Sequence, residues 1–136
     1  MKRTFQKDYE FGTRHEVDTL SALRTLNPTL VRTHNKYDPF DFVNDTYNVF
    51  VELKTRNNTK DKYPTTMISY SKILHAKKNP DRDYYFAFKF IDGIYYIKYN
   101  ASLFETFAVG EGGRFDRGFA ETNQYIYIPI ENLTMI

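Results

Sequence analysis

One aromatic segment places the strongest constraint on the fold of this chain. Residues 83–99 read DYYFAFKFIDGIYYIKY, two apolar runs joined by the turn-forming pair Asp92-Gly93. Side chains two positions apart in a strand point to the same face of a sheet. In the first run, one face carries only aromatic side chains, those of Tyr84, Phe86, Phe88 and Phe90. We therefore expect an antiparallel hairpin whose aromatic face covers the core of a β-sheet.

The remaining elements can be arranged around this hairpin. A Thr-x-x-Glu capping box at Thr13 and Glu16 begins a helix, and Asn27-Pro28 ends it. There follow three strand-like segments (30–35, 37–45 and 46–55), a second helix at roughly 66–78, and a last strand at 124–130. This order predicts an α/β fold with a mixed β-sheet flanked by helices, in a single domain of residues 1–136.

The composition excludes several classes of protein. The chain has no cysteine, which excludes disulfide frameworks, thiolate zinc sites and cysteine nucleophiles. No apolar stretch approaches the ~20 residues of a membrane span, and the N-terminus lacks the apolar core of a signal peptide. The three histidines have no metal-ligand spacing. We expect a cytoplasmic protein with no membrane partner.

Positive charge is concentrated in one part of the sequence. Residues 54–89 carry 9 basic and 3 acidic side chains, a net of +6, whereas residues 1–53 and 90–136 have nets of −1 and −3. Clustered Lys and Arg neutralise phosphates and release counterions, so this segment is suited to bind a polyanion; the alternative is a solvated basic face. The candidate nucleic-acid contacts are Arg56, Lys60, Lys62, Lys72, Lys77 and Lys78.

An acid and a base lie where this basic segment begins, inside an apolar strand. In the run FVELKT, Glu52 and Lys54 point to one face and the aliphatic residues to the other. Asp41 occupies the preceding strand, where Phe40 and Phe42 are expected to share the opposite face. If the apolar faces of the two strands align, Asp41 lies beside Glu52 and Lys54.

Such a grouping is unfavourable in a protein interior unless something uses it. Adjacent carboxylates repel each other, and desolvation raises the pKa of at least one of them. Mg²⁺ removes the conflict, since it binds one or two carboxylates together with phosphate oxygens and water. A neighbouring lysine can hold an attacking water and offset charge on the phosphate. The residue types therefore suit metal-assisted phosphodiester hydrolysis; the alternative is an exposed Glu–Lys pair worth under about 1 kcal/mol.

Glu16 is a further candidate acid. It lies on the helical stripe of Leu20 and Leu23, which places its carboxylate toward the core. Gly12, one turn earlier, permits close backbone approach. The alternative is that Glu16 only closes the capping box with Thr13, and the two roles are compatible.

Together, Gly12-x-x-x-Glu16, Asp41 and Glu52-x-Lys54 resemble the PD-(D/E)XK nuclease superfamily, which has the restriction-endonuclease-like fold. The predicted element order agrees with the αβββαβ core of that superfamily and leaves an extra C-terminal β segment. The Gly-x-x-x-Glu helix is similar to that of small Holliday junction resolvase-type nucleases.

The resemblance implies a role for each residue of the motif. Asp41 and Glu52 would be metal ligands together with the backbone carbonyl of Leu53, and the metal would be Mg²⁺, with Mn²⁺ as a substitute. Lys54 would serve the nucleophilic water, and Glu16 would be a supplementary acid.

The sequence departs from the superfamily pattern at the first acid. The Pro-Asp dipeptide of the superfamily is here replaced by Asp38-Pro39-Phe40-Asp41, so Asp38 is a rival of Asp41 for the first metal ligand. Asp38 lies at a bend before Pro39, outside the strand, and this favours Asp41. The second helix often supplies an auxiliary residue in this superfamily, and here Tyr70 and Lys72 are the candidates.

The leading hypothesis from the sequence is a metal-dependent DNA endonuclease that hydrolyses phosphodiester bonds, with branched, Holliday junction-like DNA among its candidate substrates. Because small resolvase-like enzymes of this superfamily usually act as dimers, the resemblance implies a homodimer. The small stand-alone format of the chain suggests a phage or mobile-element protein, and a phage protein would act in the host cytoplasm. The alternative is a catalytically silent nucleic-acid-binding or assembly module with a nuclease-like fold.

Overall fold

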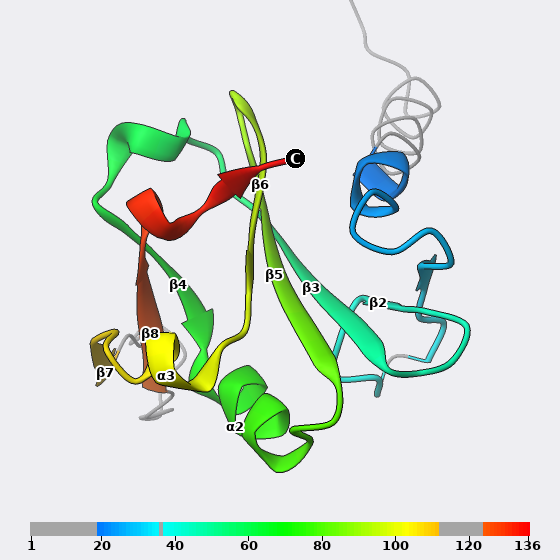
Figure 1. The fold of residues 1–136 in the computed structure, drawn as a ribbon. Coiled ribbons are helices and arrows are strands. Elements are labelled where there is room, and N and C mark those ends of the chain that lie inside the picture. The colour runs from blue at the N-terminus through cyan, green and yellow to red at the C-terminus, as the bar shows by residue number, and fades with distance from the viewer. Residues whose placement is uncertain (1–18, 36, 112–123) are drawn as a thin grey trace, which may run out of the picture.

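The computed structural model describes residues 19–35, 37–111 and 124–136 (Figure 1). Residues 19–23 are helical. The elements that follow are β1 (Val31–Arg32), β2 (Phe42–Val43), β3 (Val49–Thr55), η1 (Lys60–Lys62), β4 (Thr65–Ser69), α2 (Tyr70–Lys78), β5 (Asp83–Phe90), β6 (Gly93–Lys98), α3 (Ala101–Phe104), β7 (Val109–Glu111), β8 (Gln124–Pro129), η3 (Ile130–Asn132) and β9 (Thr134–Met135). The strands form a six-stranded sheet in the order β1-β2-β3-β5-β6-β9 and a three-stranded sheet in the order β4-β8-β7. The predicted α/β fold with a mixed sheet is confirmed.

A parallel pair of strands forms the centre of the large sheet. β3 and β5 pair in register from Val49↔Asp83 to Thr55↔Lys89, while the other neighbouring strands described in this sheet are antiparallel. Parallel neighbours need a crossover connection. Here η1, β4 and α2 supply it, and Figure 1 shows α2 and the three-stranded sheet on one side of β3 and β5, with helical residues 19–23 on the other.

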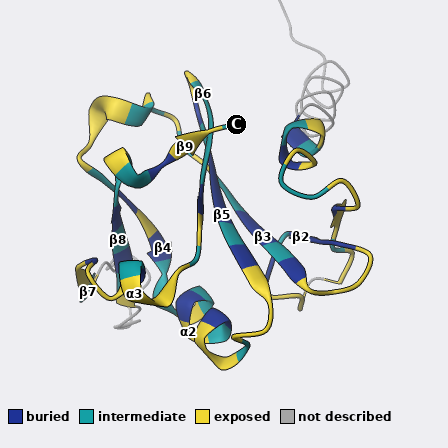
Figure 2. Cartoon of the chain, viewed as in Figure 1, coloured by how far each residue is buried: buried dark blue, intermediate teal, exposed yellow. Residues whose placement is uncertain are grey.

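Buried residues lie along β3 and β5 of the large sheet (Figure 2), and one apolar cluster lies on each face of that sheet. The face toward α2 and β8 carries the larger cluster, in which Phe86 and Phe88 are fully buried. The opposite face packs Val51 and Ala87 against Leu23 of the helical segment. The predicted aromatic face is confirmed, because all four of its residues belong to the larger cluster, namely Tyr84, Phe86, Phe88 and Phe90.

The predicted hairpin of residues 83–99 is confirmed as β5 and β6. The last pair of its ladder is Phe90↔Gly93, so the two turn residues are Ile91 and Asp92, one position earlier than the predicted pair Asp92-Gly93. Gly93 has φ +149°, a conformation that L side chains rarely adopt, which accounts for glycine at this position.

The second helix begins later than predicted. Thr65–Ser69 is strand β4, paired antiparallel with β8, and α2 begins only at Tyr70. Within β4, buried Thr66 and Ile68 alternate with exposed Met67, which is the period of a strand and not of a helix. The β-branched residues favour this extended conformation.

In the sequence, Met67, Tyr70 and Leu74 stand at helical spacing and predict an apolar stripe on that helix, and this prediction is wrong. Met67 lies on β4, and Leu74 is exposed on α2. The buried face of α2 instead carries Ile73 and Ala76, which pack against the larger cluster.

Phe40 and Phe42 do not share a face, contrary to prediction. Strand β2 consists of Phe42–Val43 alone, and the chain bends over residues 39–41. Phe42 joins the cluster of Val51, whereas Phe40 joins the larger cluster on the opposite face. The bend places Asp41 at the end of the β2–β3 ladder.

Some predictions fall outside the described residues. These are the capping box of Thr13 and Glu16, the role of Glu16 as an acid, and the close approach at Gly12. The described helices include none that is long and apolar enough to cross a membrane.

Candidate active site

The Asp41 carboxylate lies at an open edge of β3. The Asp41 N–H donates to the Val51 carbonyl at 3.1 Å, which extends the β2–β3 ladder by one bond. The Asp41 Oδ2 atom in turn accepts a hydrogen bond from the Leu53 N–H at 2.8 Å. The β2–β3 ladder ends at the pair Phe42↔Val51, so the Asp41 side chain takes the place of a partner strand beside Leu53.

Glu52 is the buried acid of the site. It is 4% exposed and lies on the face of β3 toward α2, opposite Phe86 of the parallel neighbour. Two ammonium groups reach its carboxylate: Lys54 Nζ lies 3.4 Å from Oε1 and Lys72 Nζ lies 3.7 Å from Oε2. The alternation of β3 provides Lys54, and the first turn of α2 provides Lys72.

Burial dominates the electrostatics of Glu52. Desolvation, and then the nearby charge of Asp41, raise the pKa of the Glu52 carboxyl above its ordinary value of 4.5, while Lys72 and Lys54 oppose the rise. Asp41 thus adds a second negative charge near Glu52, and the ammonium groups of Lys54 and Lys72 lie beside the buried carboxylate.

Of the two auxiliary candidates on α2, Lys72 is the one that reaches this site. Its ammonium also donates to the Pro39 carbonyl and lies 5.3 Å from the centroid of the Phe40 ring. The Tyr70 hydroxyl instead accepts a hydrogen bond from Lys77 Nζ at 2.8 Å. Lys72 thus ties α2 both to β3 and to the bend that carries Asp41.

The donor set around Asp41 and Glu52 fits a divalent cation. The N–H and C=O of one strand residue point to the same edge of the strand, so the Leu53 carbonyl faces the edge occupied by Asp41. Two carboxylates and one carbonyl are ligands that Mg²⁺ accepts while it keeps several waters. Among the residues that the structure describes, no three His, Asp or Glu side chains gather at one point, so any cation here has at most two described carboxylates.

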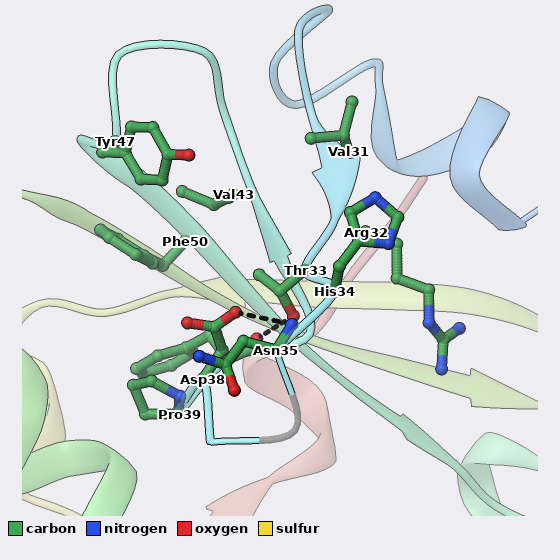
Figure 3. A pocket seen from close by; sticks show the side chains of 11 residues that line it. Val31, Arg32, Thr33, His34, Asn35, Asp38, Pro39, Val43, Tyr47 and Phe50 are labelled. Carbon is green, nitrogen blue, oxygen red and sulfur yellow. Dashed lines mark hydrogen bonds between the residues drawn. The ribbon is translucent and has the colours of Figure 1, made fainter.

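Asp38, the rival of Asp41, lies elsewhere. It is exposed, and its Oδ2 accepts a hydrogen bond from the Asn35 N–H at 3.3 Å (Figure 3). It lines a pocket between β1, β2 and the start of β3 rather than the edge of β3. It is also absent from the charges that shift the pKa of Glu52.

Two of the predicted nucleic-acid contacts point inward. Lys72 is held by Glu52, and the Arg56 guanidinium donates to the Met67 carbonyl of β4 at 2.7 Å. Arg56 also lies 6.0 Å from the centroid of the buried Phe88 ring, and burial lowers its pKa. Arg56 thus holds the edge of β4 against β3.

The other predicted contacts are divided between the two ends of β4. Lys60 and Lys62 belong to η1, before this strand, whereas Lys77 and Lys78 end α2, after it (Figure 1). Lys60 Nζ lies 3.6 Å from Asp61 Oδ1. The basic segment of the sequence is therefore not one continuous patch.

Sequence reasoning missed the groups around Phe40. The Pro39 carbonyl holds Lys72, and the Phe40 ring packs 5.3 Å from the ring of His75. His75 Nδ1 lies 3.0 Å from the Tyr84 hydroxyl, which joins α2 to β5. Pro39 signals a bend in the sequence, but nothing in the sequence indicates that this bend turns Phe40 toward α2.

These features are those of a PD-(D/E)XK nuclease domain: a mixed sheet, a crossover helix, an acid and a lysine on β3, and a second acid beside that strand. The sequence model of the family described as "Phage putative PDDEXK endonuclease" matches residues 13–136, and the chain belongs to this family. Membership implies a phosphodiester hydrolase that acts on DNA. No curated protein and no solved structure gives a significant match.

Proposed function

We propose that the protein is a metal-dependent DNA endonuclease whose site consists of Asp41, Glu52, Lys54 and Lys72. The observation that supports this most is the nearly complete burial of Glu52 between two ammonium groups and beside a second carboxylate. Such a grouping costs stability in a structural role, because buried charges lose their hydration. It suits a site that must bind a cation and a phosphate in turn.

Asp41, Glu52 and the Leu53 carbonyl would hold Mg²⁺, with Mn²⁺ as a substitute, and the bound ion supplies Lewis-acid activation of water and phosphate. Lys54 has the freedom to act on a water, because its side chain is 41% exposed while its ammonium remains at Glu52. It orients that water and offsets negative charge that develops on the phosphate. Glu16 is proposed as the supplementary acid on the strength of the motif alone.

Lys72 has a positioning role in this proposal. Its ammonium joins Glu52 on β3 to the Pro39 carbonyl, one residue before Phe40 and two before Asp41. It thereby fixes the two acids relative to each other, and its positive charge limits the rise in the pKa of Glu52.

A homodimer on branched DNA extends the proposal. A two-fold axis pairs two sites with two strands, which is what symmetric cleavage of a junction requires. The family description supports a phage protein, which would act in the host cytoplasm. Light scattering of the purified protein, alone and with a four-way junction, measures the stoichiometry.

Cleavage of DNA tests the enzymatic assignment. A supercoiled plasmid and a labelled four-way junction are incubated with Mg²⁺, with Mn²⁺ and with EDTA. Cleavage should require the ion, disappear in Lys54→Ala, and persist in Lys98→Ala, which removes an exposed lysine paired with Asp83. DNA retention without cleavage in either ion would instead establish the binding module.

A further inference from the structure

A pocket of about 290 Å³ adjoins the candidate active site. Pro39 and Phe40, which Lys72 contacts in addition to Glu52, form part of its lining. Its remaining walls come from β1, β2 and the loop that leads into β3 (Figure 3). A strand of DNA bound at Glu52 would therefore pass the mouth of this pocket.

An exposed tyrosine stands at the rim of the pocket in an unusual conformation. Tyr47 has φ 55°, and it is the one described non-glycine residue with positive φ; its side chain is 68% exposed. Buried Asn44 holds the turn, because its Oδ1 accepts hydrogen bonds from the N–H groups of Asn48 and Val49, both at 2.9 Å. A bulky residue at positive φ is uncommon, and here the turn that Asn44 holds presents the Tyr47 ring at the rim of the pocket.

The pocket combines flat aromatic surfaces with polar groups. Tyr47 and Phe50 lie on one side in Figure 3 and His34 on the other, with Asn35 and Asp38 between them. Phe50 is held rigidly, since its ring stacks on that of Tyr84 with a centroid distance of 5.3 Å and an interplanar angle of 16°. These are the elements of a site for a planar heterocycle whose edge carries hydrogen-bonding groups.

We infer that this pocket receives one unpaired nucleobase of the substrate, from a nucleotide next to the cleaved phosphate. The inference rests on the proposed nuclease function and adds a substrate class to it, DNA that contains a bulged, flipped or single-stranded base. The volume is at the lower end for ligand pockets, which suits one base. The Asp38 carboxylate disfavours a phosphate, and it accepts hydrogen bonds only, so it favours guanine, which presents two adjacent N–H donors.

Binding without cleavage tests the pocket separately from catalysis. Fluorescence anisotropy in EDTA compares a duplex with a single guanine bulge against the fully paired duplex. The wild-type protein should bind the bulged DNA about tenfold or more tightly, because one stacked base is worth roughly a tenfold to hundredfold change in affinity. Equal affinity for the two DNAs would overturn the inference.

Two substitutions at Tyr47 separate recognition from folding. Tyr47→Gly and Tyr47→Asn remove the ring but accept positive φ, so the melting temperature should stay equal or rise by about 2 °C. Both variants should lose the preference for bulged DNA, while Tyr63→Ala, which removes an exposed ring beside η1, should keep it. A preference that survives in both Tyr47 variants contradicts the inference.

The carboxylate of Asp38 is tested by the identity of the bulged base. Asp38→Asn should lower the preference for guanine over thymine about tenfold, whereas Asp81→Asn, an exposed acid after α2, should not. Unchanged base preference in Asp38→Asn removes the acid from the pocket's function. If the wild-type protein prefers bulged DNA but cleaves neither DNA with Mg²⁺ or Mn²⁺, the pocket stands and the nuclease proposal fails.

Discussion

Replacing Lys72 by methionine isolates the ion pair that joins α2 to β3. Methionine keeps most of the length of the side chain and its contact with the Phe40 ring, but it removes the charge. The buried Glu52 then keeps only the ammonium of Lys54. We expect this variant to be less stable than the wild-type protein and less able to hold Glu52 in its ionised form.

The distance and the burial set the size of the effect. At 3.7 Å between Lys72 Nζ and Glu52 Oε2, the Coulomb energy is about 4 kcal/mol at an effective dielectric constant of ~20 and about 1 kcal/mol in bulk water. The two side chains are 22% and 6% exposed, so the pair lies between these limits, and desolvation cancels part of the gain. With the bond to the Pro39 carbonyl, the expected loss is about 2 kcal/mol.

A double-mutant cycle by urea unfolding at pH 7 measures this coupling. In a Glu52→Gln background, Lys72→Met should cost only about 1 kcal/mol, because the bond to Pro39 is all that remains to be lost. Lys54→Met is the comparison, and its cost should stay under about 1 kcal/mol because that side chain is 41% exposed. Equal costs of Lys72→Met in the two backgrounds would refute the pairing of Lys72 with Glu52.

Three further predictions concern titration, metal binding and the basic residues. Because the pKa of Glu52 is raised, the native state binds the proton of this carboxyl group more tightly than the unfolded chain does. The free energy of unfolding should therefore fall as the pH rises from 4.5 through the raised pKa. Urea titrations of Glu52→Gln at several pH values should show no such fall. Asp41→Asn keeps an acceptor for the Leu53 N–H and should leave the melting temperature nearly unchanged. Mg²⁺ binding measured by calorimetry should vanish in Asp41→Asn but remain in Asp38→Asn. An unchanged binding isotherm in Asp41→Asn would point to other ligands. Arg56→Met should cost about 1–2 kcal/mol because the half-buried guanidinium holds β4, whereas Lys62→Ala should leave stability unchanged and weaken DNA binding at low salt; the opposite ranking contradicts the assignment.

The alternation of apolar and polar residues was enough to predict β3, β5 and β6 and the face on which Glu52 and Lys54 lie. Each of these strands has a strong local pattern, and strand geometry then fixes the direction of every side chain. Strand β4 could not be predicted in this way. Its residues alternate in burial, but the segment is short, and Met67, Tyr70 and Leu74 also stand at helical spacing, so the local pattern did not separate a strand from a helix.

The candidate site was predictable only as far as it lies on one strand. The alternation of side chains along β3 predicted that Glu52 and Lys54 lie on one face, but nothing in the sequence selected Tyr70 or Lys72 as the residue by which α2 reaches the site. The predicted apolar stripe included Met67, which belongs to β4, so it misassigned the buried face of α2, which carries Ile73 and Ala76. Pro39 signals a bend, but no residue type indicates that this bend turns Phe40 toward α2.

The parallel pairing of β3 and β5 has a consequence for how activity arises during folding. The crossover of η1, β4 and α2 must close before these strands can meet, and long-range parallel pairing is slow because loop closure costs entropy. Lys72 lies on that crossover and Glu52 on β3, so Glu52 gains its second ammonium partner only after the crossover has packed against β3, whereas Lys54 lies on the same strand as Glu52. A chain in which this crossover has not closed consequently lacks the Lys72–Glu52 ion pair of the candidate site.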